Sequence, residues 1–456
     1  MKIKTTLLAG ALVSSSLSAI AMDLMEAWQA TRQHDPQVNI SAASRAIGEA
    51  QKTQATSLWR PTIVLGATAG VTSAATTVSG AHFSAPAFGE SDGVGFGTSV
   101  ENGSSTRWVL SASQPLINKG RRAQSRQLQI ASEVSELEWQ IAQQDLILRT
   151  AQRYFNVVLL DSKLSVLRAQ QKAVDLARAE ATDRFSLGDK PITDTHEASA
   201  RAFALQAQVL ATENEWELAK GALTDTTGIL NSTVRILPNA AEVPPSKLAP
   251  LDQWLTAAIE KNPHLQMMLA NVKVAQQEVS KYGALSAITL DLVAQAGRDQ
   301  LNGNGSYGSA SNSATQHMIG LQLSIPLYTG GYRNAKLTEL LRLQEKATAQ
   351  VELTRQQIGQ QTRAVWLSMQ TGAARLLALT EARKASMARL DATRLGRQVG
   401  DRTTLDLLQA ENDASASDLA LLQARIELLL NQLQLHALCG QLDEQQISLV
   451  NAMLQH

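Results

Sequence analysis

The sequence has only one cysteine, Cys439, among its 456 residues. A single thiol excludes a disulfide within the chain and is too few for a metal cluster, so we expect Cys439 to be a small buried apolar residue near a helix end. Neither sign of charge is in excess, because 41 basic residues stand against 41 acidic ones. This balance argues against a basic surface that binds nucleic acid. After the N-terminus, no apolar run approaches the roughly 20 residues of a transmembrane helix.

Catalytic motifs are also missing. His196-Glu197 is not followed by the second histidine that a zinc-binding helix of this type requires. Gly93, Gly95 and Gly97 lie in a segment rich in serine and glycine, without the strand and helix that flank a nucleotide-binding loop. We therefore expect no enzymatic activity, no cofactor and no resident metal.

The N-terminus is typical of a secretory signal peptide. Lys2 and Lys4 supply positive charge, the following residues are apolar or small, and residues 19–21 match a cleavage site. The apolar run is too short and too rich in serine for a membrane anchor, and no cysteine follows the cleavage site to carry a lipid. We expect residues 1–21 to be removed, so that the mature chain begins at Met22 outside the cytoplasm. Such a chain is either soluble or crosses a membrane as a β-barrel.

The mature sequence is an internal duplication. Pro36 matches Pro263 near the start of each copy, and Gly188 matches Gly400 within a long ungapped stretch. A repeat of roughly 200 residues is too long for a solenoid unit. Each half is therefore expected to be a complete module, with the two modules quasi-equivalent around an axis. We place the first structural repeat at residues 22–237, a proline-rich linker at 238–250, the second repeat at 251–440 and a C-terminal tail at 441–456.

Long stretches without helix breakers predict long helices. Neither glycine nor proline occurs from Arg121 to Leu187, and no proline follows Pro326. Alanine, leucine, glutamine, arginine and glutamate dominate both stretches, and apolar residues recur at helical spacing. The first stretch alone would form a rod of roughly 100 Å, which implies a coiled-coil-like arrangement. We expect long helices at about 119–228 and 331–439, preceded by helical segments at 22–59 and 251–285.

Four shorter segments alternate apolar and polar residues, as strands with one apolar face do. In the last of them, Ile319, Leu321 and Leu323 alternate with Gly320 and Gln322. The segments have about the 9–11 residues of a tilted membrane strand, although the alternation alone fits a soluble sheet equally well. We expect strand pairs at about 61–73 with 106–116 and at about 287–298 with 317–327, loops at 72–105 and 298–316, and junctions from strand to helix at Pro115, Gly120, Pro326 and Gly331.

The number of strands implies that several chains share one barrel. One chain supplies four predicted strands, whereas the smallest membrane barrels have about eight. Four strands leave open edges, which lipid does not tolerate. An oligomeric barrel continued by a tube of long helices is the simplest object that satisfies both periodicities.

Four segments carry recognisable motifs, namely Trp28–Pro36, Gln114–Leu116, Ile325–Gly331 and Gly400–Leu408. Together and in this order they resemble the TolC family of outer-membrane efflux channels. The resemblance covers essentially the whole mature chain, including the duplication. It implies a mainly α-helical channel-tunnel with a membrane β-barrel, in which four strands per chain form a trimeric 12-strand barrel in the outer membrane of a Gram-negative bacterium. A long α-helical barrel is then expected in the periplasm.

By this resemblance the protein is the outer-membrane exit duct of an export complex that spans the periplasm. A homotrimer would work with a periplasmic adaptor (membrane fusion) protein and an inner-membrane pump. Asp23, Leu24 and Trp28, followed by His34-Asp35-Pro36, resemble members that serve type I protein secretion with an ABC transporter. Drug or metal efflux with a proton-driven pump is the alternative. A secreted coiled-coil protein without a pore is a further alternative, and the strand pairs in both halves argue against it.

The two turns Gly188–Asp194 and Gly400–Asp406 are the candidate functional segments. Glycine is expected to end the incoming helix, and threonine or aspartate to cap the outgoing one. The simplest interpretation is a plain helical hairpin tip whose acids are caps. In a trimer each acid would also occur three times around one axis, where carboxylates raise one another's pKa and favour cations in the lumen.

The resemblance implies roles for particular residues at this periplasmic entrance. Thr193 and Asp194 match link positions between helices in the first repeat, Arg402 matches a link position in the second, and Asp406 matches a constriction acid. These links would hold the entrance shut. The adaptor is expected to contact the hairpin tips at Leu187, Gly188, Asp189, Val399, Gly400 and Asp401.

Two residues depart from the family pattern at the entrance. Gln409 stands where a second constriction acid is found, and Arg397 stands where a link tyrosine is found. The second acidic ring is therefore in question. An ion pair between Asp194 and Arg397 is expected in place of the tyrosine link.

Overall fold

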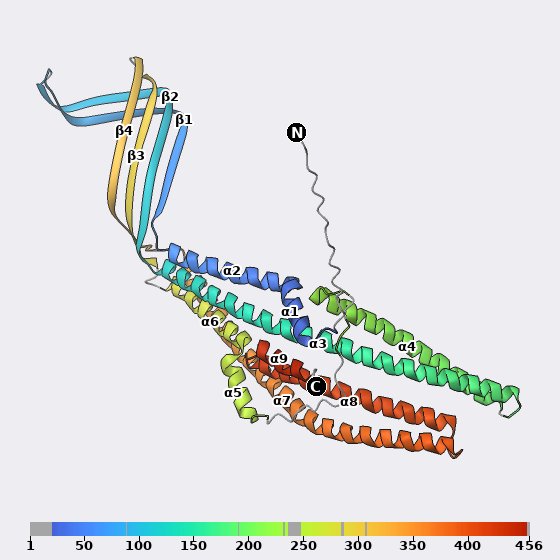
Figure 1. The fold of residues 1–456 in the computed structure, drawn as a ribbon. Helices are drawn as coiled ribbons and strands as arrows, with labels where there is room; N and C mark the ends of the chain where they lie inside the picture. Colours follow the sequence, from blue (N-terminus) through green and yellow to red (C-terminus); the bar gives the residue numbers. More distant parts are fainter. Residues whose placement is uncertain are drawn as a thin grey trace, which may run out of the picture. The chain divides into compact units, whose positions relative to one another are not determined.

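The computed structural model describes residues 21–87, 89–189, 191–230, 233–235, 248–283, 287–305 and 308–453. The predicted signal peptide, except Ala21, and residues 238–247 of the predicted linker lie outside this range. The element order repeats, with two helices, two strands and two long helices in each half (Figure 1). The first half contains α1 (Leu24–His34), α2 (Pro36–Ser57), β1 (Thr62–Ala85), β2 (Gly89–Asn118), α3 (Lys119–Ser186) and α4 (Ile192–Thr227). The second half contains α5 (Leu251–Lys261), α6 (Pro263–Tyr282), β3 (Thr289–Gly305), β4 (Gly308–Ser324), α7 (Tyr332–Gln398) and α8 (Thr404–Leu438), followed by α9 (Glu444–Ala452).

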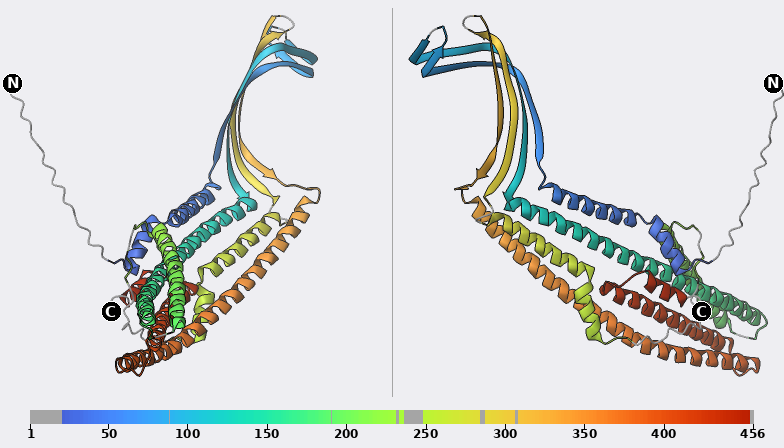
Figure 2. Two further views of the ribbon diagram at one scale, coloured as in Figure 1. Left: turned by 90° about the vertical axis from the view of Figure 1, so that its right-hand side faces the viewer. Right: turned by 60° about the vertical axis from the view of Figure 1, so that its left-hand side comes forward.

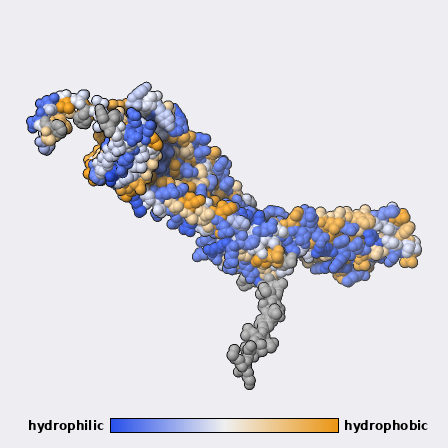
Figure 3. All heavy atoms as spheres, turned by 90° about the horizontal axis from the view of Figure 1, so that it is seen from above, coloured by the Kyte–Doolittle hydropathy of each residue, from blue (hydrophilic) through white to orange (hydrophobic). Residues whose placement is uncertain are grey.

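The four strands form one antiparallel sheet in the order β1-β2-β3-β4 (Figure 2). Register places Ile63 opposite Ala112, Ala112 opposite Ala294, and Ala294 opposite Ile319. Side chains of paired residues lie on the same face of a sheet, so the predicted apolar alternation produces one continuous apolar face. That face is open in the single chain, because Ile63 is 68% exposed and Ile319 is 76% exposed. Hydrophobic residues accordingly show on the surface of the strands in Figure 3.

The strands are longer than predicted, and the loop assignment for residues 72–105 and 298–316 is wrong over most of its length. Glycine, serine and threonine suggested loops, but cross-strand pairing satisfies their backbone groups. Beyond the reach of β3, β1 and β2 continue as a two-stranded ribbon from the Ala74–Val100 pair to the Ala85–Gly89 pair. None of the helices in the described part of the chain combines the length and hydropathy that a membrane-spanning helix requires.

The two strand-to-helix junctions differ. Pro115 lies inside β2, beside a shift in register with β3, and Gly120 already belongs to the first turn of α3. Pro326 follows the end of β4, and Gly330 and Gly331 take φ values of 62° and 82° before α7 begins. The left-handed bend that favours glycine therefore occurs only at the second junction.

The chain divides into two compact units. Of the described residues, those within 1–45, 135–268 and 351–456 form one unit, and those within 46–134 and 269–350 form the other. The sheet lies in the second unit, together with the ends of α2 and α6 and the beginnings of α3 and α7. The hairpins that α3 forms with α4 and α7 forms with α8 end in the first unit.

The first unit has a hydrophobic core to which both repeats contribute. Tyr154 and Phe155 of α3 pack edge to face, with ring centroids 5.6 Å apart. Trp28 of α1, Leu223 of α4 and Leu433 of α8 belong to the same buried cluster. Burial of each such side chain stabilises the fold by about 1.5–3 kcal/mol. Because α8 belongs to the second repeat, neither half can build this core alone.

The duplication is visible at two equivalent corners. Gly228, after α4, lies against His34 at the α1–α2 corner, and Gly440, after α8, lies against Lys261 at the α5–α6 corner. Asn262 fixes the second corner, since its side chain donates to the Leu438 carbonyl at 2.8 Å and accepts from the Leu265 amide at 3.0 Å. The carbonyl of Lys261 is thus held rigidly beside Gly440.

Cys439 caps the C-terminal end of α8 and is fully buried. Its thiol lies 3.6 Å from the Trp254 carbonyl, and burial raises its pKa to about 11. The interpretation of Cys439 as a small buried residue at a helix end is confirmed.

Replacing Gly440 by alanine should destabilise the first unit by about 3 kcal/mol, from the left-handed backbone and from overpacking. An added Cβ would lie 2.3 Å from the Lys261 carbonyl oxygen, and φ at this position is +63°. Thermal unfolding of the detergent-solubilised protein measures the effect. Gly400→Ala is the control, because φ there is +80° but nothing lies within 4 Å of the added atom. Equal losses in the two variants would contradict the close-contact argument.

Candidate functional site at the hairpin tips

Glycine ends the incoming helix of both hairpins, as predicted. Gly188 and Gly400 have φ values of 75° and 80°. In each turn two backbone bonds form a Schellman motif. The Asp189 amide donates to the Arg184 carbonyl at 2.9 Å, and the Asp401 amide donates to the Gly396 carbonyl at 2.8 Å. The two tips therefore share one backbone design.

The outgoing helices start differently. Thr403 caps α8, accepting from the Asp406 amide at 3.1 Å, while the Asp406 carboxylate accepts from the Thr403 amide at 2.9 Å. This is a reciprocal capping box. At α4 the cap is Pro191, which makes no side-chain cap hydrogen bond. The predicted threonine or aspartate cap is thus confirmed in the second repeat and wrong in the first.

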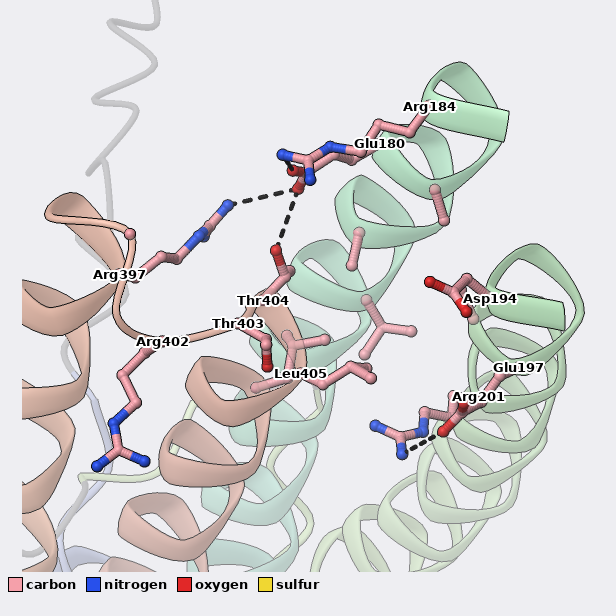
Figure 4. Close-up of a pocket in the computed structure, with 16 residues that line it drawn as sticks. Glu180, Arg184, Asp194, Glu197, Arg201, Arg397, Arg402, Thr403, Thr404 and Leu405 are labelled. Atoms are coloured by element: carbon pink, nitrogen blue, oxygen red, sulfur yellow. Dashed lines mark hydrogen bonds and ion pairs between the residues drawn. The ribbon is translucent and has the colours of Figure 1, made fainter. Parts of the chain in front are cut away.

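Glu180 of α3 links the two hairpins (Figure 4). Its Oε2 accepts from Arg397 Nη2 at 3.4 Å and from Thr404 Oγ1 at 3.5 Å. Its Oε1 pairs with Arg184 of the same helix at 2.8 Å. The Glu180 carboxylate, in the first repeat, thus accepts hydrogen bonds from both sides of the second repeat's turn. The pocket around this link is lined by charged residues of both hairpins: Glu180, Arg184, Asp194, Glu197, Arg201, Arg397 and Arg402.

The ion pair expected between Asp194 and Arg397 does not form within the described residues of one chain. Arg397 pairs with Glu180 instead. Asp194 and Thr193 lie in the first turn of α4, and Asp194 lines the same pocket. A position in the first turn of a helix stabilises a carboxylate through the helix dipole without any basic partner.

Arg402 also lines the pocket but takes no part in the Glu180 link. Figure 4 shows its side chain pointing away from Glu180. Among the described residues of one chain, Arg402 has no ion-pair partner within 4.0 Å. Its guanidinium group is therefore available to a group outside the chain.

Asp406 takes part in the N-terminal cap of α8. Hydrogen bonds from Thr403 lower the pKa of its carboxyl group, with a smaller contribution from nearby Arg402. The single chain therefore shifts this pKa in the direction opposite to that expected for a ring of repelling acids. Gln409, one turn on, donates to Asp413 at 2.9 Å, and Asp413 also pairs with Arg389 at 2.7 Å.

The residues expected to meet an adaptor lie at the ends of the hairpins. Leu187 is 82% exposed and Val399 is 74% exposed. Each directly precedes its left-handed glycine, Gly188 or Gly400. Contact of these residues with an adaptor stays a prediction.

No feature of the sequence singles out Glu180. At the equivalent distance before Gly400 the second repeat has Ala392, so the duplication does not mark the position. The unexpected arginine at position 397 was the only hint that an acid should lie nearby. The partner of Arg397 became identifiable only when α3 and α7 were placed together.

The model of the family described as outer membrane efflux protein matches residues 27–229 and 254–441. The chain belongs to the outer membrane efflux protein family. The two matched segments fall on the two halves of the duplication. Membership places the protein in the outer membrane, with its helical tunnel in the periplasm, as an exit duct and transport protein.

Members of the family resemble the chain over nearly its whole length. The outer membrane protein TolC of Escherichia coli (strain K12) is 26% identical over 447 residues, which cover 96% of this chain and 86% of TolC. The proteases secretion protein PrtF of Dickeya chrysanthemi is 25% identical over 461 residues, covering 100% of this chain and 96% of PrtF. The crystal structure of the Campylobacter jejuni CmeC outer membrane channel matches with a TM-score of 0.72 at 14% identity, covering 100% of this chain and 97% of CmeC. The predicted two-repeat channel-tunnel fold of this family is confirmed.

Replacing Glu180 by glutamine should raise the conductance of the resting channel, because the charged link between the hairpins is lost. Each exposed link of this kind contributes about 0.2–1 kcal/mol, so the effect is a partial loosening rather than full opening. Single-channel recording in planar bilayers measures it. Glu197→Gln is the matched control, since Glu197 pairs with Arg201 inside α4 and forms no ion pair with another helix among the described residues. Equal conductance in the two variants would show that Glu180 does not hold the entrance shut.

Replacing Thr403 by alanine should raise the pKa of Asp406 towards the usual aspartate value of about 3.9. A lowered folded-state pKa stabilises the cap above the unfolded value, and that stability is lost as pH falls through the folded value. In the variant the folded pKa approaches the unfolded one, so this pH-dependent contribution is largely lost, and amide exchange in residues 404–410 should be about fivefold faster at neutral pH. Hydrogen–deuterium exchange with mass spectrometry tests both effects. Thr193→Ala, at the uncapped helix start, should leave exchange in α4 unchanged, and an equal acceleration there would argue against a capping effect.

Proposed function

We propose that three copies of this chain enclose a conduit and conduct substrates passively, without catalysis, when the hairpin tips are pulled apart. The observation that carries the proposal is the open sheet. Its apolar face is exposed, and the outer edges of β1 and β4 have no partner strand within the described residues of one chain. Pairing β1 of one copy with β4 of the next satisfies both edges, and three sheets give twelve strands.

Type I protein secretion is the function we favour. PrtF is named a proteases secretion protein, and its alignment covers the whole of this chain and nearly the whole of PrtF. The inner-membrane partner would then be an ABC transporter, joined to the duct by a periplasmic adaptor.

Drug or metal efflux is the second candidate. The family description itself names efflux. In that case a proton-driven pump would replace the ABC transporter, and the duct would need no change in its own chemistry.

The Glu180 link and the Arg402 side chain suggest how the entrance is held shut. Glu180 joins the hairpins within each chain. Arg402, without an ion-pair partner in the described residues of its own chain, would bond to a neighbouring chain. An adaptor that grips the exposed tips would separate both sets of contacts. Arg402→Ser should therefore raise the resting conductance independently of Glu180→Gln.

Expression of the chain in a bacterium that lacks its own TolC, together with a type I ABC transporter, its adaptor and its protease substrate, tests the favoured function. Extracellular protease activity should be restored, because the duct completes the path across the outer membrane. A transporter variant that cannot hydrolyse ATP is the control and should abolish secretion. Restored resistance to small toxic compounds, with the protease still retained in the cell, would instead support the second candidate.

A further inference from the structure

On β2, β3 and β4 the apolar face of the sheet ends at a well-defined row of residues. Going from the helices towards the hairpin ends of the strands, the row Leu110–Ala296–His317 is followed by the row Trp108–Arg298–Thr315. The next rows on the same face are polar on β2, β3 and β4: Thr106, Gln300 and Ser313, then Ser104, Asn302 and Ser311. On these three strands the boundary between apolar and polar surface thus passes through Trp108 and Arg298, while β1 continues apolar with Ala69 and Val71.

Arg298 is an unusual residue for this face. It is exposed and lies directly opposite Trp108 across the β2–β3 pair. His317, also exposed, is its diagonal neighbour on β4; diagonal neighbours are about 7–8 Å apart, within reach of long side chains. Among the described residues of the chain, no acidic side chain forms an ion pair with Arg298.

The other face of the same strands balances its charge. Arg107, next to Trp108 in sequence, projects to the opposite side of the sheet and lies directly opposite Asp299. The polar face therefore provides a carboxylate beside its arginine, and the apolar face does not. An arginine at an apolar boundary without a carboxylate opposite it can bind an anion from elsewhere.

The position of the Trp108–Arg298–Thr315 row along the strands indicates its depth in the membrane. The periplasmic helices join the sheet at Asn118, Thr289 and Ser324, so the hairpin ends of the strands point outwards. On the proposed assembly the apolar face is the one that meets lipid, and the Arg298 row then lies at the outer headgroup level. Tryptophan is the residue most suited to that level, because its ring is apolar and its N–H is polar.

We infer that Trp108, Arg298 and His317 form a site for a lipid phosphate group of the outer leaflet, with up to three copies around the assembly. Arg298 supplies a planar fork of donors that matches phosphate oxygens. Trp108 packs against the adjoining acyl and sugar groups, and the hydroxyl and amide rows beyond accept and donate hydrogen bonds to the headgroup. The inference rests on the proposed membrane assembly and deepens it, because it names the lipid chemistry that this face selects.

Lipid A bearing its phosphates is the probe, added to the full mature protein in detergent and counted by native mass spectrometry. Arg298→Gln should weaken lipid A binding about tenfold, the loss expected for one charge-assisted contact. Arg298→Lys should lose less, because the charge remains. Arg107→Gln is the matched control on the opposite face and should change binding less than about twofold. Lipid A without phosphates should bind the unaltered protein as weakly as phosphorylated lipid A binds Arg298→Gln.

Equal binding by Arg298→Gln and Arg107→Gln, or no preference of the unaltered protein for the phosphorylated lipid, would overturn the inference. Competition by millimolar inorganic phosphate would also overturn it, because it would indicate a site for the free anion. Single-channel recording on the same preparations separates this result from the proposed function. Arg298→Gln should conduct normally, and an absence of channels in every preparation would count against the assembly itself.

Discussion

The unpaired edges of the four-stranded sheet are the constraint on which the rest of this structure depends. Backbone donors and acceptors cannot be left unpaired in lipid, and one chain provides two such edges, on β1 and β4. Additional copies of the chain are the simplest source of partners. Once copies are arranged in a ring, each feature of the chain is multiplied around the axis, so a modest contact such as the Glu180 link acts several times.

The duplication within the chain is consistent with the same arrangement of equivalent units around an axis. The equivalent corners at Gly228 and Gly440 show that the two halves pack by the same rule. The core around Tyr154 joins α3 and α4 of the first repeat to α8 of the second, so the halves are fixed to each other. The hairpin tips, by contrast, are connected by exposed hydrogen bonds and ion pairs of 3.4–3.5 Å. A firm core and weakly joined tips are what a duct with a movable entrance requires.

Helices and apolar strand faces could be predicted well from the sequence, whereas strand pairing and ion pairs could not. Helices and the apolar sides of strands follow from local patterns, and Gly188 and Gly400 follow from the requirement of a left-handed turn. Residues 72–105 were assigned to a loop because composition reports turn preference, whereas the register of β1 with β2 decides pairing. The predicted partner of Arg397 within the chain, Asp194, was also wrong, because the packing of the helices, and not the sequence pattern, decides which acid lies beside Arg397. Capping by an acid at the start of α8 could be predicted from the sequence, and the structure adds that Thr403 and Asp406 cap it reciprocally.

The number of chains in the purified particle tests the central claim most directly. Native mass spectrometry of the mature protein in detergent should give three times the mass of one chain. The same trimer should migrate as an SDS-resistant species before boiling. A stable particle containing a single chain, with the apolar face of its sheet covered by detergent alone, would contradict the account.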